Sequence, residues 1–339
     1  MKLKQIGEFG FINRIMRGCL IRESGIIKSI GDDSAVFSIP ENEVILVTTD
    51  LLIEGVHFIR KATSGFNLGH KAMAVNLSDI AAMGGTAREA FVSIGIPPDC
   101  PVEFLDDLYN GMKALAAEYE VNLLGGDTTR SGRDLIINVS ITGSAARDKI
   151  VYRDNAANGD LLFTTGNLGD SRAGLHLVLN DTESEYPEFD FLKKAHFLPK
   201  AYLHEGKFLA STGSTSAMID ISDGLSSDLA HIIEGSNTGA RIYADKLPIS
   251  PALRKFCALF NFDETNFAVS GGEDYTLLFT LRPERADEIS EKYLSLFGEK
   301  LIGLGEITET GKIELIMPDG ASRAIEPSGW DHFRRGRKR

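Results

Sequence analysis

Residues 44–50 read VILVTTD and residues 67–85 read NLGHKAMAVNLSDIAAMGG, and together these two stretches indicate the kind of fold. The first is an apolar, β-branched run that predicts a buried strand ending at Asp50. The second has small and apolar residues at helical spacing and stops at two glycines, which predicts a helix. A further apolar run at residues 91–96, stopped by two prolines, predicts a second strand. A strand, a helix and a strand in this order are typical of an α/β domain.

The alternation of strands and helices continues along the chain. An amphipathic helix is expected at residues 102–120. Further strands are expected at residues 135–142, 161–165, 267–269, 276–280, 302–307 and 313–317. The acidic residues 181–190 are expected to form a surface loop, and Ser222 is expected to cap the helix that follows it. The chain of 339 residues therefore predicts two α/β domains, residues 1–147 and 148–339.

The composition argues against several classes of protein. Hydrophobic residues make up 43% and charged residues 25%, as in a globular rather than a disordered chain. The net charge of −12 argues against nucleic-acid binding, which depends on phosphate neutralisation by Lys and Arg. No apolar run approaches the ~20 residues that span a bilayer, and none near the start fits a secretory signal. The three cysteines fit free thiols in a reducing compartment, so the cytoplasm is the expected location.

A set of aspartates shares one context, because each follows an apolar run or a glycine at the boundary of an expected element. They are Asp33, Asp50, Asp79, Asp127, Asp220 and Asp223. Each one taken alone fits a turn residue or a helix cap. Ligands of open α/β sheets bind beyond the carboxyl ends of strands, where several carboxylates would repel each other unless cations lay among them. Mg²⁺ prefers oxygen ligands and is often shared with substrate phosphates, so the set predicts a Mg²⁺-dependent enzyme of phosphate transfer.

The familiar phosphate-binding motifs are absent from the sequence. Residues 65–71 read GFNLGHK and do not fit G-x-x-x-x-G-K-[ST], and the protein-kinase signatures are also missing. Two glycine pairs followed by an acid, at residues 125–127 and 271–273, could either approach a ligand or form tight turns. His57 follows the strand that ends at Asp50, so it could reach the same site or lie in a surface loop.

Seven motifs occur in order along nearly the whole chain. They are IGDDSAV (30–36), VTTDLLIEGVHF (47–58), KAMAVNLSDIAAMGG (71–85), LLGGDTTRS (123–131), MIDISDGLSSDLAH (218–231), SGGEDYTLLFT (270–280) and GWDHF (329–333). This series closely resembles the thiamine-monophosphate kinase family, within the aminoimidazole-ribonucleotide synthetase superfamily of ATP-binding proteins. The resemblance implies a two-domain α/β fold of mixed sheets flanked by helices. It also implies direct, in-line phosphate transfer from ATP to thiamine monophosphate with several Mg²⁺ ions, and a homodimer formed through the N-terminal domains.

The resemblance also implies roles for individual residues. The implied metal ligands are Asp33, Thr48, Thr49, Asp50, Asp79, Asp127, Asp220 and Asp223. The implied ATP contacts are Tyr109, Gly126, Asp127, Arg153 and Ser222, and the implied contacts to thiamine monophosphate are His57, Glu273 and Trp330. Among these, the implied catalytic residues are Asp50, Asp79, Asp220 and Arg153. The N-terminal domain is expected to bind ATP and Mg²⁺ and to dimerise, and the C-terminal domain to complete the ATP and thiamine-phosphate site.

Three other functions use the same residues. One is another synthetase of the superfamily that activates an amide or formyl group with ATP; a selenophosphate synthetase is disfavoured, because the N-terminal region has only Cys19 and no glycine-flanked reactive cysteine. A second is a phosphatase or nucleotide hydrolase that directs the metals at water. A third is a regulator that binds a nucleotide without turnover. ADP release that depends on thiamine monophosphate would separate the kinase from all three.

Overall fold

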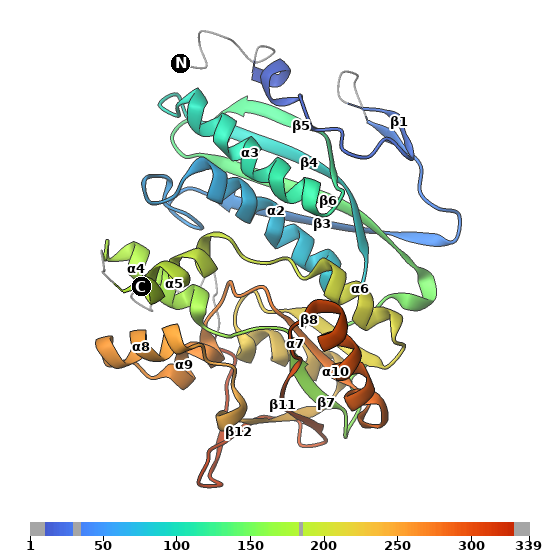
Figure 1. Ribbon diagram of the computed structural model, residues 1–339, viewed down its shortest axis with the longest axis vertical. Coiled ribbons are helices and arrows are strands. Elements are labelled where there is room, and N and C mark those ends of the chain that lie inside the picture. Colours follow the sequence, from blue (N-terminus) through green and yellow to red (C-terminus); the bar gives the residue numbers. More distant parts are fainter. Residues whose placement is uncertain (1–10, 30–34, 183–185, 329–339) are drawn as a thin grey trace. The chain divides into compact units, whose positions relative to one another are not determined.

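The computed structural model describes residues 11–29, 35–182 and 186–328 of the chain. The chain forms two compact units, Met1–Ile150 and Val151–Arg339, here called the N-terminal and C-terminal units. The sequence pattern predicts a boundary after residue 147. Each unit combines a mixed sheet with helices, which confirms the predicted α/β class (Figure 1). No helix in the described ranges is long and apolar enough to cross a membrane.

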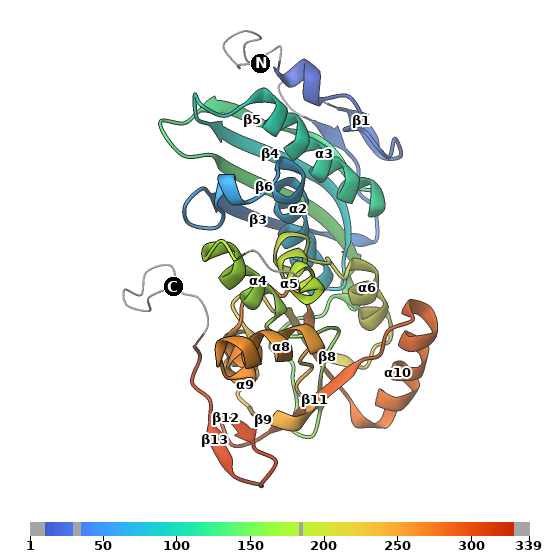
Figure 2. The ribbon, with the colours of Figure 1, turned by 60° about the vertical axis from the view of Figure 1, so that its left-hand side comes forward.

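The N-terminal unit contains a four-stranded sheet in the order β3-β6-β4-β5, and only β4 and β5 pair in parallel. The strands are β3 (Glu43–Ile53), β4 (Thr86–Ile96), β5 (Asn122–Arg130) and β6 (Ile136–Ala146). Helices α2 (Gly65–Ala82) and α3 (Val102–Glu118) cover one face of the sheet (Figures 1 and 2). The smaller elements are β1 (Ile26–Lys28), β2 (Val36–Phe37) and the 3₁₀ turns Arg60–Ala62 and Arg147–Lys149. One face of the sheet therefore lies under helices. The other, here called the open face, is contacted by Phe37 of β2, whose ring centroid is 6.4 Å from that of Phe91 on β4.

Helix α2 begins after Ser64, whose side chain accepts a hydrogen bond from the backbone N–H of Asn67. Its backbone packs directly against α3 because glycines lie at the crossing. A Cβ atom at Gly69 would lie 1.9 Å from the carbonyl oxygen of Leu108, and one at Gly111 would lie 2.0 Å from that of Phe66. These close contacts fix α2 against α3.

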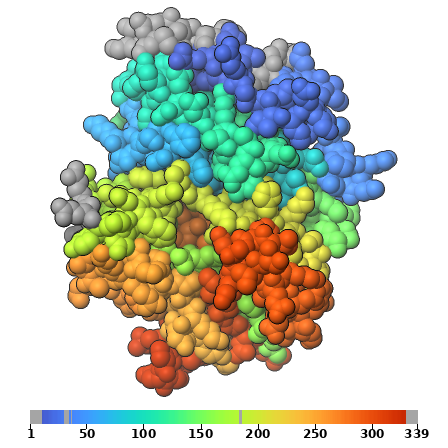
Figure 3. All heavy atoms as spheres, viewed as in Figure 1, coloured from blue at the N-terminus to red at the C-terminus, as the bar shows by residue number. Residues whose placement is uncertain are grey.

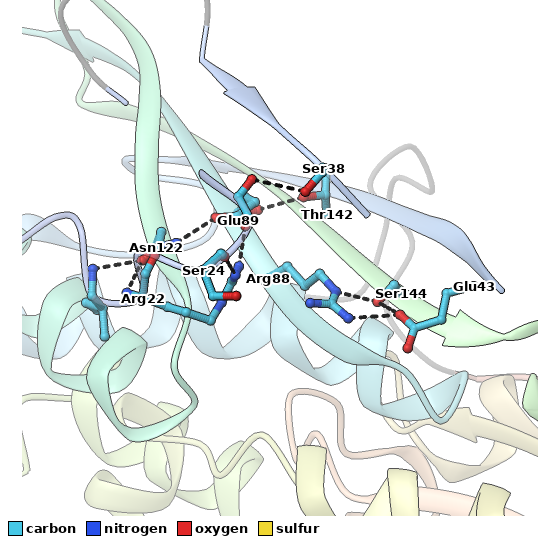
Figure 4. A network of polar contacts seen from close by, with 11 residues as sticks. Arg22, Ser24, Ser38, Glu43, Arg88, Glu89, Asn122, Thr142 and Ser144 are labelled. Carbon is cyan, nitrogen blue, oxygen red and sulfur yellow. Dashed lines mark hydrogen bonds and ion pairs between the residues drawn. The ribbon is translucent and has the colours of Figure 1, made fainter. Parts of the chain in front are cut away.

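A buried polar network attaches an N-terminal segment to β4 and β5 (Figure 4). The Oδ1 atom of Asn122 accepts from the backbone N–H groups of Ile21 (2.7 Å) and Arg22 (2.6 Å). Its Nδ2 atom donates to Glu89 (3.0 Å), and the Arg22 guanidinium also contacts Glu89. Burial raises the pKa of Glu89, while Asn122 and Arg22 oppose this rise. The network therefore compensates the buried carboxylate and fixes residues 21–22 on the sheet.

The C-terminal unit contains a seven-stranded sheet in the order β13-β12-β9-β11-β7-β10-β8, in which β12 and β9 are the parallel pair. Its strands are β7 (Leu161–Thr164), β8 (Thr215–Asp220), β9 (Gly239–Tyr243), β10 (Leu277–Leu281), β11 (Ile302–Thr308), β12 (Ile313–Ile316) and β13 (Ser322–Ala324). Its helices are α4 (Asp170–Leu179), α5 (Pro187–Phe197), α6 (Leu203–Ser211), α7 (Leu225–Ser236), α8 (Pro251–Phe260), α9 (Glu264–Ser270) and α10 (Pro283–Phe297), with a 3₁₀ turn at Ala244–Lys246. Leu225, Leu229 and Ile232 of α7 join the main apolar core with Leu278 of β10. Helix α10 lies on the face of this unit seen in Figure 3.

Two predicted elements of the C-terminal unit are wrong. Residues 267–269 belong to helix α9 rather than to a strand, because Asp263 caps it by accepting from the N–H groups of Thr265 and Asn266. The acidic stretch 181–190 is only partly a loop, because α5 begins at Pro187. A proline at the first helical position and acidic side chains in the first turn both favour a helix start.

Candidate active site

Three of the predicted metal ligands come together in the N-terminal unit. The alternation of β3 places Thr48 and Asp50 on the face that α2 covers, and Asp79 lies on α2. The Thr48 hydroxyl donates a hydrogen bond to the Asp79 carboxylate. Burial and then the Asp79 charge raise the pKa of Asp50 to about 6. Burial also raises the pKa of Asp79, whereas the Thr48 hydrogen bond lowers it. The result is a group of hard oxygen atoms with two carboxylates that disfavour each other's ionisation.

The side chains of Thr49 and Asp127 lie on the opposite, open face of the sheet. The Thr49 hydroxyl is 2.9 Å from both Asn138 Nδ2 and Ser140 Oγ on β6. The strand register pairs Asp127 with Ser93 and Ser93 with Asn138, so Asp127 shares this face and is exposed. The structure therefore does not bring these two side chains to the Asp50–Asp79 pair. Their predicted metal contacts remain predictions.

The glycine pair before Asp127 lies within β5 and does not form a turn. Gly126 has a φ of 142°, and a Cβ atom there would lie only 1.8 Å from the carbonyl oxygen of Val92. Close pairing of β4 and β5 thus requires glycine at this position. The predicted contact of Gly126 with ATP remains a prediction.

His57 lies in the tight turn that follows β3. Its Nδ1 atom accepts a hydrogen bond from the Ile53 N–H (3.0 Å), and its own backbone N–H donates to the Ile53 carbonyl (2.9 Å). An imidazole that accepts at Nδ1 carries its proton on Nε2 when neutral. These two hydrogen bonds to Ile53 therefore orient the ring at the end of β3.

Tyr109, a predicted ATP contact on α3, is buried within the N-terminal unit. Its ring packs edge-on against Phe11, with the ring centroids 5.9 Å apart, and burial raises its pKa above the usual range. The residue lies beside a hollow of about 350 Å³. The residues lining this hollow are Arg14, Ile15, Asp106, Tyr109, Asn110 and Lys113. The structure thus places Tyr109 in a packing role, and its contact with ATP remains a prediction.

In the C-terminal unit, two predicted ligand contacts lie on adjacent loops. Asp220 is buried at the end of β8 and pairs with Leu277 of β10. The pairing continues past the strands, because the Glu273 N–H donates to the Ser222 carbonyl (2.7 Å). A Cβ atom at Gly272 would lie 2.7 Å from the same carbonyl oxygen, so glycine is required at that position. Ser222 and Glu273 are therefore held side by side.

Asp228 is a site residue that the sequence reasoning missed. Its Oδ2 atom accepts from the backbone N–H groups of Asp223 (3.1 Å) and Gly224 (3.0 Å) at the start of α7. Burial, followed by the charges of Asp220 and Asp223, raises its pKa to about 8. The predicted cap at Ser222 is wrong, because Gly224 is the N-cap residue and an acid in the first turn satisfies the free amides. That acid, four residues after the glycine, was the available sequence signal.

A second missed group surrounds Glu273. Asp274 is half-buried and accepts from the N–H groups of Gly169 (2.6 Å) and Ser171 (3.2 Å) at the start of α4. Burial raises its pKa to about 8, against the two backbone hydrogen bonds. His196 of α5 also lies in this group, 3.3 Å from Glu273. No local sequence pattern marks these contacts.

The remaining predicted site residues are Asp33, Arg153 and Trp330. Asp33 and Trp330 lie outside the described residues, and Arg153 is exposed in the loop before β7. Within the described ranges, no group of three or more His, Cys, Asp or Glu side chains is arranged to hold a metal ion. The donors that do meet, at Thr48, Asp50 and Asp79, are all oxygen atoms and fit a hard cation such as Mg²⁺.

Comparison with known proteins agrees with this architecture. Residues 31–145 match the family "AIR synthase related protein, N-terminal domain", and residues 157–318 match the corresponding C-terminal domain. Fold and site thus define a two-domain protein of the AIR synthase related class. The chain is 35% identical over 337 residues to the thiamine-monophosphate kinase of Aquifex aeolicus, covering 98% of this chain and 100% of that protein. It is 34% identical to that of Escherichia coli K12, covering 96% and 98%. The chain belongs to the thiamine-monophosphate kinase family.

Solved structures show the same likeness. The thiamine-monophosphate kinase from Stenotrophomonas maltophilia K279a has a TM-score of 0.82 at 33% identity, covering 93% of this chain and 97% of that chain. AaThiL complexed with AMPPCP and TMP has a TM-score of 0.78 at 35% identity, covering 98% and 99%. The resemblance carried by the seven motifs and the two-domain mixed α/β fold are both confirmed.

Proposed function

We propose that this chain transfers a phosphate group from ATP to thiamine monophosphate, forming thiamine diphosphate and ADP. The observation that carries the proposal is the similarity to thiamine-monophosphate kinases over 98% of the chain. The structural relative bound to AMPPCP and TMP supports ATP as the donor and thiamine monophosphate as the acceptor. Phosphate transfer requires little covalent chemistry from the protein, so positioning and charge neutralisation account for most of the catalysis.

The acceptor needs no strong base, because its phosphate oxygen is already anionic near neutral pH. The main obstacle is repulsion between two anionic substrates. Mg²⁺, when bound, would neutralise part of that charge. In the N-terminal unit, Thr48, Asp50 and Asp79 would hold it. The raised pKa values of Asp50 and Asp79 support this, because two close carboxylates favour a cation. The further predicted ligands are Asp33, Thr49, Asp127, Asp220 and Asp223.

The C-terminal unit supplies an ordered pair of loops for the substrates. Ser222 is proposed to contact ATP and Glu273 thiamine monophosphate, and the hydrogen bond between their backbones supports a shared role. The Glu273 carboxylate would attract the cationic thiazolium ring of the acceptor. Arg153, exposed in its loop, would offer a fork of donors to a phosphate. His57 and Trp330 complete the proposed contacts to thiamine monophosphate.

The protein is further proposed to form a homodimer through the open face of the N-terminal sheet. The support is a stripe of apolar side chains on the edge strand β3: Ile45 is 51% exposed, Val47 69% and Leu51 47%. Exposed apolar stripes of this kind mark interaction surfaces, and an edge strand offers unpaired backbone groups. The cytoplasmic location remains a prediction from the sequence.

The deciding experiment measures ADP release from ATP with a panel of phosphorylated vitamins and nucleotide intermediates, with and without Mg²⁺. The proposal predicts release with thiamine monophosphate and Mg²⁺ together and little release when either is omitted. Steady phosphate release from ATP alone would identify a hydrolase instead. Tight ATP binding without any turnover would identify a nucleotide-binding regulator.

A further inference from the structure

His196 occupies a core position of α5 that the apolar pattern would assign to an aliphatic side chain. The buried residues of α5 are Phe189, Leu192 and His196, which follow helical spacing on one face. His196 is 4% exposed. A buried imidazole costs free energy unless its nitrogen atoms are hydrogen-bonded, so packing alone does not account for it.

The contacts of the ring point to Glu273. The Nδ1 atom of His196 lies 3.3 Å from Glu273 Oε2 and 3.2 Å from Ser171 Oγ. The Glu273 side chain keeps 29% exposure, whereas that of His196 keeps 5%. The imidazole therefore holds the carboxylate from the interior, and the carboxylate remains accessible to a ligand.

Hydrogen bonds also hold the backbone around Glu273 in place. Glu273 has a φ of +65°, in the left-handed region, and its N–H is bonded to the Ser222 carbonyl. The neighbouring Asp274 accepts from the N–H groups of Gly169 and Ser171. Ser171 thus joins both parts, through its N–H to Asp274 and its hydroxyl to His196. A loop with this many constraints presents one side chain in one orientation.

We propose that His196 is a positioning residue for the reaction, which orients the Glu273 carboxylate toward the cationic ring of the acceptor. This inference rests on the proposed function, because it takes Glu273 as the contact to thiamine monophosphate. A proton on Nδ1 would face Glu273 Oε2 across the 3.3 Å contact and limit the rotamers of a long, flexible side chain. Ordering the carboxylate in advance lowers the cost of binding and leaves ATP binding unaffected.

The test compares variants that fill the same space with and without a donor at the Nδ1 position. H196L removes the donor, H196N places an amide near Nδ1, and H196Q places it near Nε2 instead. H196L and H196Q are expected to raise the KM for thiamine monophosphate about tenfold, the effect of one lost charge-assisted hydrogen bond. H196N is expected to restore most of this loss, and the KM for ATP should change less than about twofold in all three. If H196L fails to fold, the contrast between H196N and H196Q still decides.

A double-mutant cycle with E273Q shows whether His196 acts through Glu273. In the E273Q background, H196L is expected to raise the KM for thiamine monophosphate by less than about twofold. The reason is that the carboxylate that His196 positions has already been replaced. The exposed His204 provides the matched control: H204L should leave both KM values unchanged. The positioning role would be overturned if H196L raised the KM for thiamine monophosphate equally in both backgrounds. It would also be overturned if H196N and H196Q had equal KM values for thiamine monophosphate.

Binding of thiamine monophosphate, measured by calorimetry without ATP, separates this inference from the proposed function. A wild-type protein that binds thiamine monophosphate without turnover would end the kinase proposal, and the same variants compared by Kd would still decide the role of His196. If E273Q binds as tightly as the wild type, Glu273 is not a substrate contact and the inference fails. If E273Q weakens binding but H196L and H196Q do not, the inference fails while the function stands.

Discussion

Asp50 on β3 and Asp79 on α2 are close enough that the charge of Asp79, after burial itself, helps to raise the pKa of Asp50 to about 6. Burial also raises the pKa of Asp79, and the hydrogen bond from the Thr48 hydroxyl partly offsets this rise. Two half-buried carboxylates this close together disfavour the ionised state unless a cation compensates them. The packing of α2 on β3 therefore creates a site that favours a cation such as Mg²⁺.

The first prediction is that Asp50→Asn abolishes phosphate transfer without unfolding the protein. A neutral amide is a weaker ligand for a hard cation, so kcat is expected to fall at least about 100-fold. Mg²⁺ should raise the unfolding temperature of the wild type and have a smaller effect on the variant. Asp220→Asn is expected to behave in the same way. Near-full activity of either variant at limiting Mg²⁺ would contradict the assignment of that residue.

The second prediction concerns the loop that carries Asp223. Asp228→Ala leaves the N–H groups of Asp223 and Gly224 without their acceptor, which is expected to lower the free energy of unfolding by about 1–3 kcal/mol. Activity should also fall, because the loop loses its fixed geometry. Asp228→Asn keeps an acceptor oxygen and should retain more of both properties.

Denaturant unfolding and ADP release measure these two effects. Glu234→Ala, at an exposed position of the same helix, is the control and should change neither. An Asp228→Ala variant as active and as stable as the wild type would show that the two hydrogen bonds have no role in ordering the loop.

Long periodic elements are predictable from this sequence, because many residues contribute to one pattern. The helix expected at residues 67–83 is found as α2 at Gly65–Ala82, and the strand expected at residues 44–49 extends as β3 to Ile53. The short helix α9 is not predictable from the apolar pattern, because three apolar residues fit either the helical or the strand period. The cap at Asp263, whose side chain accepts hydrogen bonds from the first turn, favours the helix over a strand.

The candidate site can likewise be predicted only in part from the sequence. Asp50 and Asp79 stand out in sequence as charges at an expected strand end and within an apolar helix. The structure brings them together, although Asp50 lies within β3 rather than at its end. The contacts of His196 and Asp274 could not be predicted, because Asp274 reaches Gly169 across 105 residues of sequence. Thr49 follows Thr48 directly, yet strand alternation places its side chain on the other face.

The third prediction is a change in pH dependence on Asp274→Asn. The pKa of Asp274 is raised from 3.8 to about 8 in the folded protein, so the folded protein binds this proton more tightly than the unfolded chain does. Its contribution to stability is therefore full below pH 3.8 and is lost as the pH rises toward 8. Removing the carboxyl group should flatten the fall in stability across this window.

Denaturant unfolding of both proteins at several pH values between about 4 and 8 provides the measurement, and the difference between the two curves is the readout. A constant offset from the altered hydrogen bonds does not affect this slope. Parallel curves would show that Asp274 does not titrate in this range.

The fourth prediction concerns assembly. Val47→Glu puts a charge in the middle of the exposed apolar stripe on β3 and is expected to weaken the proposed homodimer at least about tenfold. Sedimentation over a range of protein concentrations measures the effect. Leu296→Glu, on α10 with 63% exposure, is the matched control and should leave assembly unchanged. Equal dissociation constants for the wild type and Val47→Glu would exclude this face as the interface.

The last prediction concerns Trp330, which lies outside the described residues and is the only tryptophan in the sequence. If it stacks on the cationic thiazolium ring, thiamine monophosphate should change the intrinsic fluorescence much more than ATP does. Trp330→Ala should raise the Kd for thiamine monophosphate about tenfold, with a smaller change for ATP. Trp330→Phe keeps an aromatic face and should lose less affinity for thiamine monophosphate. Equal losses of both ligands in Trp330→Ala would instead indicate that the ring packs within the fold.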